Sequence, residues 1–232
     1  GNYFTLAKAA AATRNVLGEE GLRLRSYVQS HGTGTPQNRT TESHILSQIA
    51  QTFGIENWPV AAIKSYIGHS IGSASGDQLS ASLGTWSDGI IPGILTVDEI
   101  ADDVHQQNLD FLLQHSEVGP EGMDAVLINS KGFGGNNASA SILAPHVVQR
   151  MLGKRHGSEK LKQYKQRHEQ VQEQSADHDR AAMEGINNTI YRFDHGVLGS
   201  DAIEMTDRQI KIANYEHPVS LELQNHYEDM CD

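Results

Sequence analysis

Hydrophobic positions along residues 1–145 repeat with helical and strand-like periods in alternation. Apolar residues three and four apart, bounded by glycine, are typical of amphipathic helices, whereas short β-branched runs are typical of buried strands. The pattern predicts three helices, over residues 3–17, 41–53 and 75–86. It also predicts four strands, over residues 24–29, 60–63, 125–129 and 138–143. Helices and strands in alternation, ending in two adjacent strands, predict a layered α/β domain.

Residues 146–232 follow a different pattern. Seven positions from Leu161 to Ala182 repeat at alternating steps of three and four, but three of the seven are polar. This spacing predicts a long helix lying on another surface, and not a strong coiled coil. Three β-prone runs come after it, over residues 189–193, 202–205 and 210–213. We expect the polar segment 206–209 to turn a hairpin between the last two runs.

The composition of the chain changes near Pro145. Residues 1–149 carry 7 basic and 14 acidic side chains, whereas the shorter stretch 150–232 carries 11 and 15. Glycine is concentrated in the first stretch, which holds 17 of the 22. We therefore expect a buried, turn-rich domain over residues 1–145 and a charged extension of unknown role over residues 146–232.

The net charge and the single cysteine disfavour several classes of protein. A net charge of -11 repels phosphate backbones, so we expect no nucleic-acid partner. No apolar run approaches the roughly 20 residues that cross a bilayer, so we expect no membrane span, and no basic-then-apolar leader opens the chain. The lone Cys231 excludes a disulfide framework and a cysteine-rich zinc site, and it favours a reducing compartment, most simply the cytoplasm.

Three glycine-rich loops follow three of the predicted strands. They read His-Gly-Thr-Gly-Thr-Pro at residues 31–36, Lys-Ser-Tyr-Ile-Gly-His-Ser-Ile-Gly at residues 64–72, and Gly-Phe-Gly-Gly-Asn-Asn at residues 132–137. Loops at the carboxyl ends of parallel strands converge on one crevice. Glycine lets the backbone approach a ligand there and leaves N–H groups free to donate. Taken alone, each loop is more commonly a phosphate cradle or a tight turn.

Two of these loops carry a histidine and one carries a lysine. Imidazoles of His31 and His69 that share a crevice can donate Nε2–H bonds to one developing oxyanion. The ammonium of Lys64 can balance charge in the crevice or orient a histidine. The other histidines form no close pair with a carboxylate at metal-binding spacing, so we predict no metal site.

The three loop sequences, in this order, resemble the C-terminal half of the β-ketoacyl-[acyl carrier protein] synthases. These condensing enzymes of fatty acid and polyketide assembly have the thiolase-like fold. The resemblance covers residues 3–144 and leaves the extension unexplained. It implies a layered α-β-α half-domain with a mixed, mainly parallel sheet, and a decarboxylative Claisen condensation of an acyl group with malonyl-carrier protein.

The resemblance also implies roles for individual residues. Family members use a Cys–His–His set, in which the two histidines match His31 and His69. The family's lysine, five residues before the second histidine, matches Lys64. The glutamate that follows the first loop matches Glu42, which we expect to be structural and near the site.

A second group of residues matches positions that contact or admit the substrate. The phenylalanine of the third loop matches Phe133, which the family uses as a gate beside the nucleophile and whose backbone N–H belongs to an oxyanion hole. Thr33, Thr35 and Gly134 match the neighbouring loop positions, so the resemblance implies substrate binding or gating for them too.

The chain departs from the family pattern at a few positions in these loops. Asn38 and Arg39 stand where Gly-Asp is usual, and Lys131 stands where the third loop usually opens with an apolar or aromatic residue. Asn136 replaces the usual threonine. We expect Arg39 and Lys131 to add positive charge near the mouth of the crevice, which an acidic carrier protein or a phosphopantetheine arm would tolerate.

The nucleophilic cysteine of the family belongs to its N-terminal half, which this sequence lacks. Cys231 has acidic neighbours, which do not favour a reactive thiolate, so we interpret it as a tail residue. The resemblance implies that the missing half, an acyl carrier protein and a second copy of the intact enzyme are partners. It implies no metal or redox cofactor, because the phosphopantetheine arm arrives on the carrier protein. Two alternatives stay open: a non-catalytic partner of the chain-length-factor type, and a scaffold or docking module.

Overall fold

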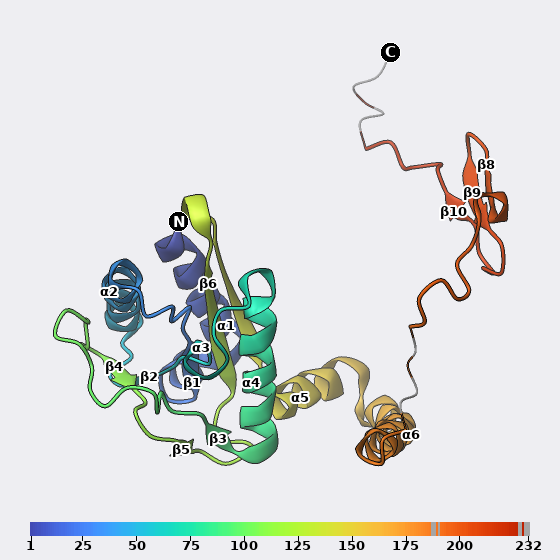
Figure 1. The fold of residues 1–232 in the computed structure, drawn as a ribbon. Coiled ribbons are helices and arrows are strands. Elements are labelled where there is room, and N and C mark those ends of the chain that lie inside the picture. Colours follow the sequence, from blue (N-terminus) through green and yellow to red (C-terminus); the bar gives the residue numbers. More distant parts are fainter. Residues whose placement is uncertain (187–188, 190, 227–228, 230–232) are drawn as a thin grey trace. The chain divides into compact units, whose positions relative to one another are not determined.

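The computed structural model describes residues 1–186, 189, 191–226 and 229 (Figure 1). The chain divides into two compact units, Gly1–Lys165 and Gln166–Asp232, and each is described by itself. The domain boundary expected at residue 145 stays a prediction. Within the first unit, Val147 of the helix that follows Pro145 is buried, so this helix contributes to that unit's core. Among the described residues, no helix is long and apolar enough to cross a membrane.

The first unit alternates helices and strands. Its helices are α1 (Asn2–Leu24), α2 (Pro36–Phe53), α3 (Lys64–Ile67), α4 (Ala74–Asp88) and α5 (Pro145–His156). Its strands are β1 (Ser26–Gln29), β2 (Trp58–Ala61), β3 (Ile90–Ile91), β4 (Leu109–Phe111), β5 (Ser116–Glu117), β6 (Ala125–Lys131) and β7 (Asn137–Leu143). Short 3₁₀ turns lie at η1 (Ile71–Ser73) and η2 (Phe133–Gly135). All three predicted helices and all four predicted strands are present, with boundaries shifted by a few residues.

A five-stranded sheet in the order β4-β2-β1-β6-β7 forms the centre of this unit. Strands β4, β2, β1 and β6 are parallel, and only β7 runs antiparallel. In the register, Val28 pairs with Val60 on one side and with Leu127 on the other. The sheet is thus mixed and mainly parallel, as predicted, and its three strands that precede the glycine-rich loops are immediate neighbours.

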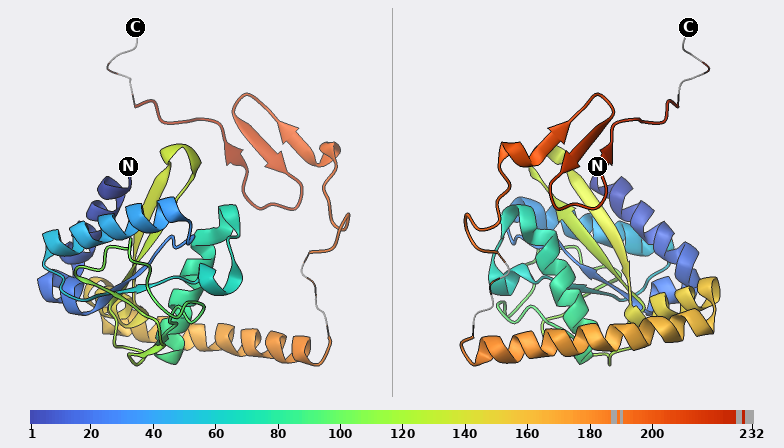
Figure 2. Two further views of the ribbon diagram at one scale, coloured as in Figure 1. Left: turned by 60° about the vertical axis from the view of Figure 1, so that its left-hand side comes forward. Right: turned by 90° about the vertical axis from the view of Figure 1, so that its right-hand side faces the viewer.

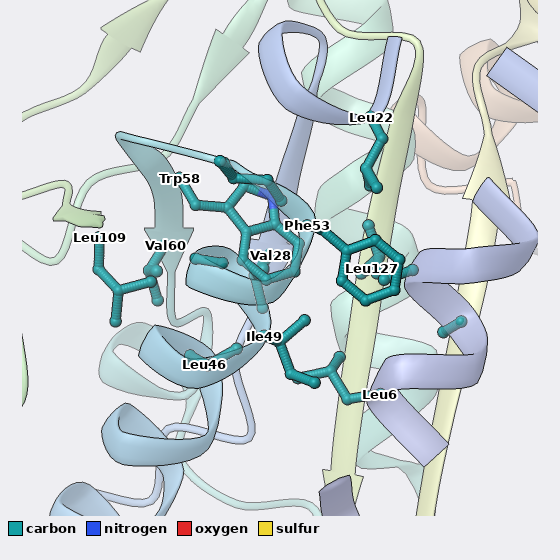
Figure 3. Close-up of a cluster of buried hydrophobic side chains, with 14 residues drawn as sticks. Leu6, Leu22, Val28, Leu46, Ile49, Phe53, Trp58, Val60, Leu109 and Leu127 are labelled. Carbon is teal, nitrogen blue, oxygen red and sulfur yellow. The ribbon is translucent and has the colours of Figure 1, made fainter. Parts of the chain in front are cut away.

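The strands bury both faces, because helices cover the sheet from two sides (Figure 2). On one face, α1 and α2 pack their apolar residues on Val28, Val60 and Leu127. The close-up in Figure 3 shows this cluster around Trp58. On the other face, Tyr27, Val126 and neighbouring residues pack with α4 and α5. This α-β-α layering follows from the period of two in a strand, which sends alternate side chains to opposite faces.

Two glycines set where helices of this unit break or end. Gly18, with φ 78°, interrupts α1 at the place where the sequence predicted its end, and a last helical turn continues to Leu24. Gly54, with φ 67°, ends α2 in the left-handed conformation. Such backbone conformations favour glycine because a Cβ atom clashes there.

The long helix predicted in the extension is present as α6 (Ser158–Met183). It crosses from the first unit into the second. None of its residues is buried. The surface on which it was expected to lie stays a prediction.

The second unit contains the predicted hairpin. Strand β8 (Ile203–Met205) pairs antiparallel with β9 (Gln209–Ile212), and a third strand, β10 (Val219–Ser220), pairs with β9. The Thr206 hydroxyl accepts backbone N–H groups of Arg208 and Gln209, which closes the turn. The two-residue β10 was not predicted, because its sequence is too short for a period to be recognised. Of the run 189–193, the described residues are not in a strand. Cys231 lies outside the described residues.

Candidate active site

The carboxyl ends of β1, β2 and β6 lie at one edge of the sheet, and each is followed by one of the glycine-rich loops. His31 comes two residues after the end of β1, and His69 follows α3, which begins shortly after β2. Their imidazole rings lie with centroids 5.2 Å apart and with planes at 82°. The parallel topology therefore brings together the two histidines that the sequence singled out.

A buried carboxylate holds the backbone of the first loop. Glu42, on α2, accepts the backbone N–H of His31 at 2.7 Å and that of Gly32 at 3.0 Å. It also accepts side-chain amide bonds from Asn38 at 2.9 Å and Asn129 at 2.6 Å. Four donors satisfy a buried charge that would otherwise be costly. Glu42 thus fixes the loop that carries His31, as its expected structural role requires.

The Nδ1 atom of each imidazole accepts a backbone N–H. Nδ1 of His31 accepts from Lys131 at 3.3 Å, and Nδ1 of His69 accepts from Ile71 at 3.0 Å. A neutral imidazole whose Nδ1 accepts carries its proton on Nε2. We therefore assign the Nε2–H tautomer to both rings, so that each has one donor left for a ligand.

The backbone that supplies the donor to His69 is strained. Ile71 has φ 61°, a region that a β-branched residue rarely occupies. Conformations of this kind persist where the surroundings hold them, and they cluster at functional sites. The strain lies at the residue whose N–H sets the tautomer of His69.

Electrostatics keep the His31 ring neutral. Burial, and after it the positive charge of Lys64, lowers the pKa of the His31 imidazole to about 4. Glu42 acts in the opposite direction, and His69 and Lys131 add smaller effects that lower the pKa. At neutral pH the ring is therefore an uncharged donor through Nε2–H.

Lys64 is buried beside this pair without a hydrogen-bond partner. Lys64 is 7% exposed, and its Nζ atom donates no hydrogen bond within the part of the chain that the structure describes. Burial lowers the pKa of the Lys64 ammonium, against the opposing effects of Glu42 and Asp77. An unpaired buried donor of this kind is costly and is a mark of a functional site.

A cavity of about 420 Å³ opens beside these residues. The backbone of the first loop, Lys64 and His69 form its polar wall, in which Thr33 and Gly34 take part. The remaining wall is mostly apolar, and its members are Leu46, Ile94, Val97, Ile100, Val104, Phe111 and Leu113. The pocket thus offers a few polar groups at one end of an apolar space, which suits a ligand with a polar head and an apolar body.

Four of the residues that the resemblance singled out do not line this cavity: His31, Thr35, Phe133 and Gly134. Phe133 is 97% exposed and lies in η2, in the exposed loop between β6 and β7. Gly134, at φ 72°, is also exposed. Thr35 caps α2, and its hydroxyl lies 3.3 Å from that of Thr33. Of the four residues expected around one pocket, Lys64 and His69 line this cavity, whereas His31 does not, although its ring lies against that of His69. The expectation for Phe133 is wrong for this cavity, because its side chain is exposed and does not line it.

Sequence reasoning missed the amides that tie the loops together. Gln78 of α4 is fully buried, and its Nε2 donates to the carbonyls of Gln29 at 2.9 Å, Ser30 at 2.7 Å and Asn129 at 3.1 Å. The Asn129 side chain in turn pairs with Asn2 at 2.6 Å. A signal was present, since Asn129 ends an apolar strand and Gln78 lies in a helix of small residues.

Arg39 and Lys131, which were expected to add positive charge near the mouth of the crevice, both have side-chain partners within the chain. Arg39 pairs with Asp103 through two bonds of 2.8 and 2.9 Å, which balances its charge. The ammonium of Lys131 donates to Asn38 at 2.7 Å and to Thr41 at 3.0 Å. Asp103 thus balances the charge of Arg39, whereas the partners of Lys131 are neutral and its positive charge still acts on His31, whose pKa it helps to lower.

Among the described residues, no group of three or more His, Cys, Asp or Glu side chains could hold a metal ion. The described site offers the N–H donors of His31 and His69 beside the buried ammonium of Lys64. Such a set can stabilise negative charge that develops on one oxygen atom.

Comparison with known proteins shows which proteins the chain resembles. Residues 5–98 match the family model described as the C-terminal domain of the beta-ketoacyl synthases. All 232 residues align at 41% identity with the beta-ketoacyl-[acyl-carrier-protein] synthase FabY of Pseudomonas aeruginosa, of which the chain spans 36%. The crystal structure of that ketosynthase superposes over the whole chain with a TM-score of 0.90.

More distant relatives match a shorter part. The 3-oxoacyl-[acyl-carrier-protein] synthase 1 of Escherichia coli is 31% identical over 113 residues, which are 49% of this chain and 26% of that protein. The fatty acid synthase subunit alpha of Gibberella zeae is 30% identical over 145 residues, which are 61% of this chain and 9% of that protein. In each comparison the chain spans far less than two thirds of the relative.

Proposed function

Because the chain belongs to the β-ketoacyl synthases, as the C-terminal half of a ketosynthase fold, we propose that the complete protein is a 3-oxoacyl-[acyl carrier protein] synthase. The reaction is a decarboxylative Claisen condensation between an acyl group and malonyl-carrier protein. The acyl group is first held as a thioester on a cysteine of the part that precedes this chain.

In the second step the malonyl group loses carbon dioxide, and the electron pair of the broken C–C bond forms an enolate on the thioester. The enolate carbon then attacks the acyl-enzyme carbonyl. A C–C bond forms, the bond to the cysteine sulfur breaks, and the thiolate leaves. The product is a 3-oxoacyl thioester on the carrier protein, two carbons longer than the acyl group.

His31 and His69 supply the N–H donors for this step. Both rings have Nδ1 occupied by a backbone N–H, so both Nε2–H groups are free to bind the malonyl thioester oxygen. Charge on that oxygen grows as carbon dioxide leaves, so neutral donors stabilise the transition state more than the ground state. This pairing of two neutral donors is the observation that carries the proposal.

Lys64 serves the same step by its charge. Its ammonium lowers the pKa of His31 and keeps that ring in the neutral form, whose Nδ1 can accept from the backbone. It also offsets the negative charge of Glu42 in the buried region, and Glu42 in turn raises the pKa of Lys64.

The carrier protein and its phosphopantetheine arm are the proposed partners. The arm would pass the first loop, where Thr33 and Thr35 present hydroxyl groups, and the apolar wall of the cavity suits the aliphatic part of the arm. Phe133 and Gly134 lie in an exposed loop, where they could gate access once the missing half is present. We propose no metal or redox cofactor and a homodimer for the complete enzyme.

A non-catalytic partner subunit is the alternative. Such a subunit needs the fold but has no use for two histidines poised as donors. Identification of the residue at the nucleophile position of the complete protein separates the two, because a partner subunit lacks cysteine there.

The direct test incubates the complete protein with an acyl thioester and malonyl-carrier protein, and measures the 3-oxoacyl product by mass spectrometry. We expect time-dependent product from the complete protein and none from the 232-residue chain alone, which lacks the proposed nucleophile. Cys231→Ser in the complete protein is the matched control and should leave the rate unchanged. Absence of product from the complete protein, or product from the chain alone, would contradict the proposal.

A further inference from the structure

We propose that Lys131 and Asn38, two residues that depart from the family pattern, form a positioning pair that fixes the ring of His31. The inference rests on the proposed function of His31. It differs from the expectation that Lys131 contributes charge for a carrier protein.

Four hydrogen bonds form a closed circuit that begins and ends at His31. The backbone N–H of His31 donates to Glu42 at 2.7 Å, and the amide of Asn38 donates to the other carboxylate oxygen at 2.9 Å. The ammonium of Lys131 donates to the Asn38 amide oxygen at 2.7 Å. The backbone N–H of Lys131 then donates to Nδ1 of His31 at 3.3 Å. Lys131 therefore contributes two of the four hydrogen bonds, one from its side chain and one from its main chain.

The location of Lys131 explains why its main chain needs this support. It is the last residue of β6, where the ladder with β7 closes at the pair Lys131 and Asn137. The next five residues are exposed, so packing does not hold the strand end in place. Strand ends of this kind open readily, because few buried contacts oppose the opening. The side-chain tether to α2 compensates for the missing packing.

The tether connects two elements that together define the His31 ring. Helix α2 holds the His31 backbone through Glu42, whereas the end of β6 holds Nδ1 through the N–H of Lys131. The bond from Lys131 to Asn38, with a second bond to Thr41 at 3.0 Å, fixes the end of β6 relative to α2. The contact to Nδ1 is long, so a small displacement of the strand end would break it. Its loss would free the ring to rotate or to take the other tautomer.

The same bonds argue against a role for Lys131 in binding the carrier protein. The ammonium already donates to an amide oxygen and a hydroxyl, and the side chain is half-buried. A partner's carboxylate would have to displace these bonds. The two roles also differ kinetically: a positioning residue affects kcat, whereas a docking residue affects KM for the carrier-bound substrate.

Kinetics of malonyl decarboxylation by the complete protein give the first test. Lys131→Met should lower kcat about tenfold, which corresponds to about 1.4 kcal/mol, with KM for malonyl-carrier protein unchanged. Asn38→Ala should lower kcat by a smaller factor, because the Lys131 ammonium keeps its hydrogen bond to the Thr41 hydroxyl. The double variant should resemble Lys131→Met alone, since both residues act through one circuit. Lys131→Arg should restore most of the activity, and Lys8→Met, which removes an exposed charge on α1, is the matched control.

The second test does not depend on activity. Nitrogen chemical shifts of ¹⁵N-histidine-labelled 232-residue chain report the tautomer of His31, and the His31→Gln spectrum identifies its signals. We expect the Nε2–H form in the wild type and a mixture of both tautomers in Lys131→Met. If the wild type fails to decarboxylate malonyl groups, the proposed function is wrong. The tautomer measurement still tests whether the Lys131 side chain holds the His31 ring. An unchanged His31 tautomer in Lys131→Met, or an increase in KM with kcat unchanged, would overturn the inference.

Discussion

The carboxylate of Glu42 accepts the backbone N–H of His31 at 2.7 Å, although the two residues lie on different elements of the fold. The histidine is thereby held by its main chain, and its ring is left for the crevice. Glu42 accepts from four donors, and none of the described cationic side chains forms an ion pair with it. It stabilises the loop through hydrogen bonds and not through a salt bridge.

Replacement of Glu42 by glutamine should therefore be costly. Both carboxylate oxygens of Glu42 accept from N–H groups. In glutamine one of these oxygens is replaced by an NH₂ group, so two hydrogen-bond donors would face each other in the buried site. We expect Glu42→Gln to lower the free energy of unfolding by about 2–4 kcal/mol. Chemical denaturation measures this, with Glu56→Gln, an exposed site, as a control that should change by less than about 0.5 kcal/mol. A Glu42→Gln protein as stable as that control would show that the carboxylate is dispensable.

Gln78 gives a second prediction about stability. Its buried amide donates to three carbonyl groups at the ends of β1 and β6. Leucine at this position fills similar space but leaves those carbonyls without their donor, so Gln78→Leu should lower the free energy of unfolding by about 2–3 kcal/mol. The matched control is Gln48→Leu on α2, because the Gln48 amide donates to the exposed Gln51 side chain at 3.4 Å and to no buried carbonyl in the described structure. Equal effects at both positions would contradict this account of Gln78.

The lowered pKa of His31 makes a prediction about pH. In the unfolded chain a histidine titrates near 6.5, whereas burial and Lys64 lower the pKa of folded His31 to about 4. Between these values the unfolded state binds the extra proton, so stability rises with pH in that window and falls as pH decreases toward 4. A single such group changes the free energy of unfolding by at most about 1.4 kcal/mol per pH unit.

Denaturation of the wild type and of His31→Gln from pH 4 to pH 7 isolates this contribution. Other acidic groups affect both proteins alike, so the difference between the two curves reports His31. We expect the slope of stability against pH to be smaller in the variant below pH 6.5 and the same above it. Parallel curves over the whole range would mean that the pKa of His31 is not lowered in the folded state.

Most of the fold followed from the sequence because its strands are short apolar runs and its helices break or end at glycines, as α1 breaks at Gly18 and α2 ends at Gly54. The convergence of the loops followed from the same pattern, since neighbouring parallel strands place their carboxyl ends together. What the sequence could not provide was the set of partners of polar side chains. The sequence predicts a positive charge at Lys131, but it does not show that the Lys131 ammonium donates to the amide oxygen of Asn38. Such pairings join residues far apart in sequence and have no periodic signal.

Phe133 is a residue for which the sequence predicted a contact that the structure lacks. Its loop sequence matched the family well, which suggested a place in the pocket, but the structure leaves the side chain 97% exposed. A motif fixes the backbone of a loop through its glycines, whereas the burial of a side chain depends on what packs on it. Within the described chain, no other residue buries the side chain of Phe133.

The central claim is that His31 and His69 donate together to one oxygen atom. Its most direct measurement is the rate of malonyl decarboxylation by the complete protein in the His31→Ala and His69→Ala variants, with acyl loading of the nucleophile measured in parallel. His44→Ala is the matched control, because His44 is an exposed histidine on α2. We predict that each of the two variants loses about 10²–10³ in decarboxylation rate while acyl loading stays detectable and the control keeps the wild-type rate. Decarboxylation at the wild-type rate in either variant would contradict the account.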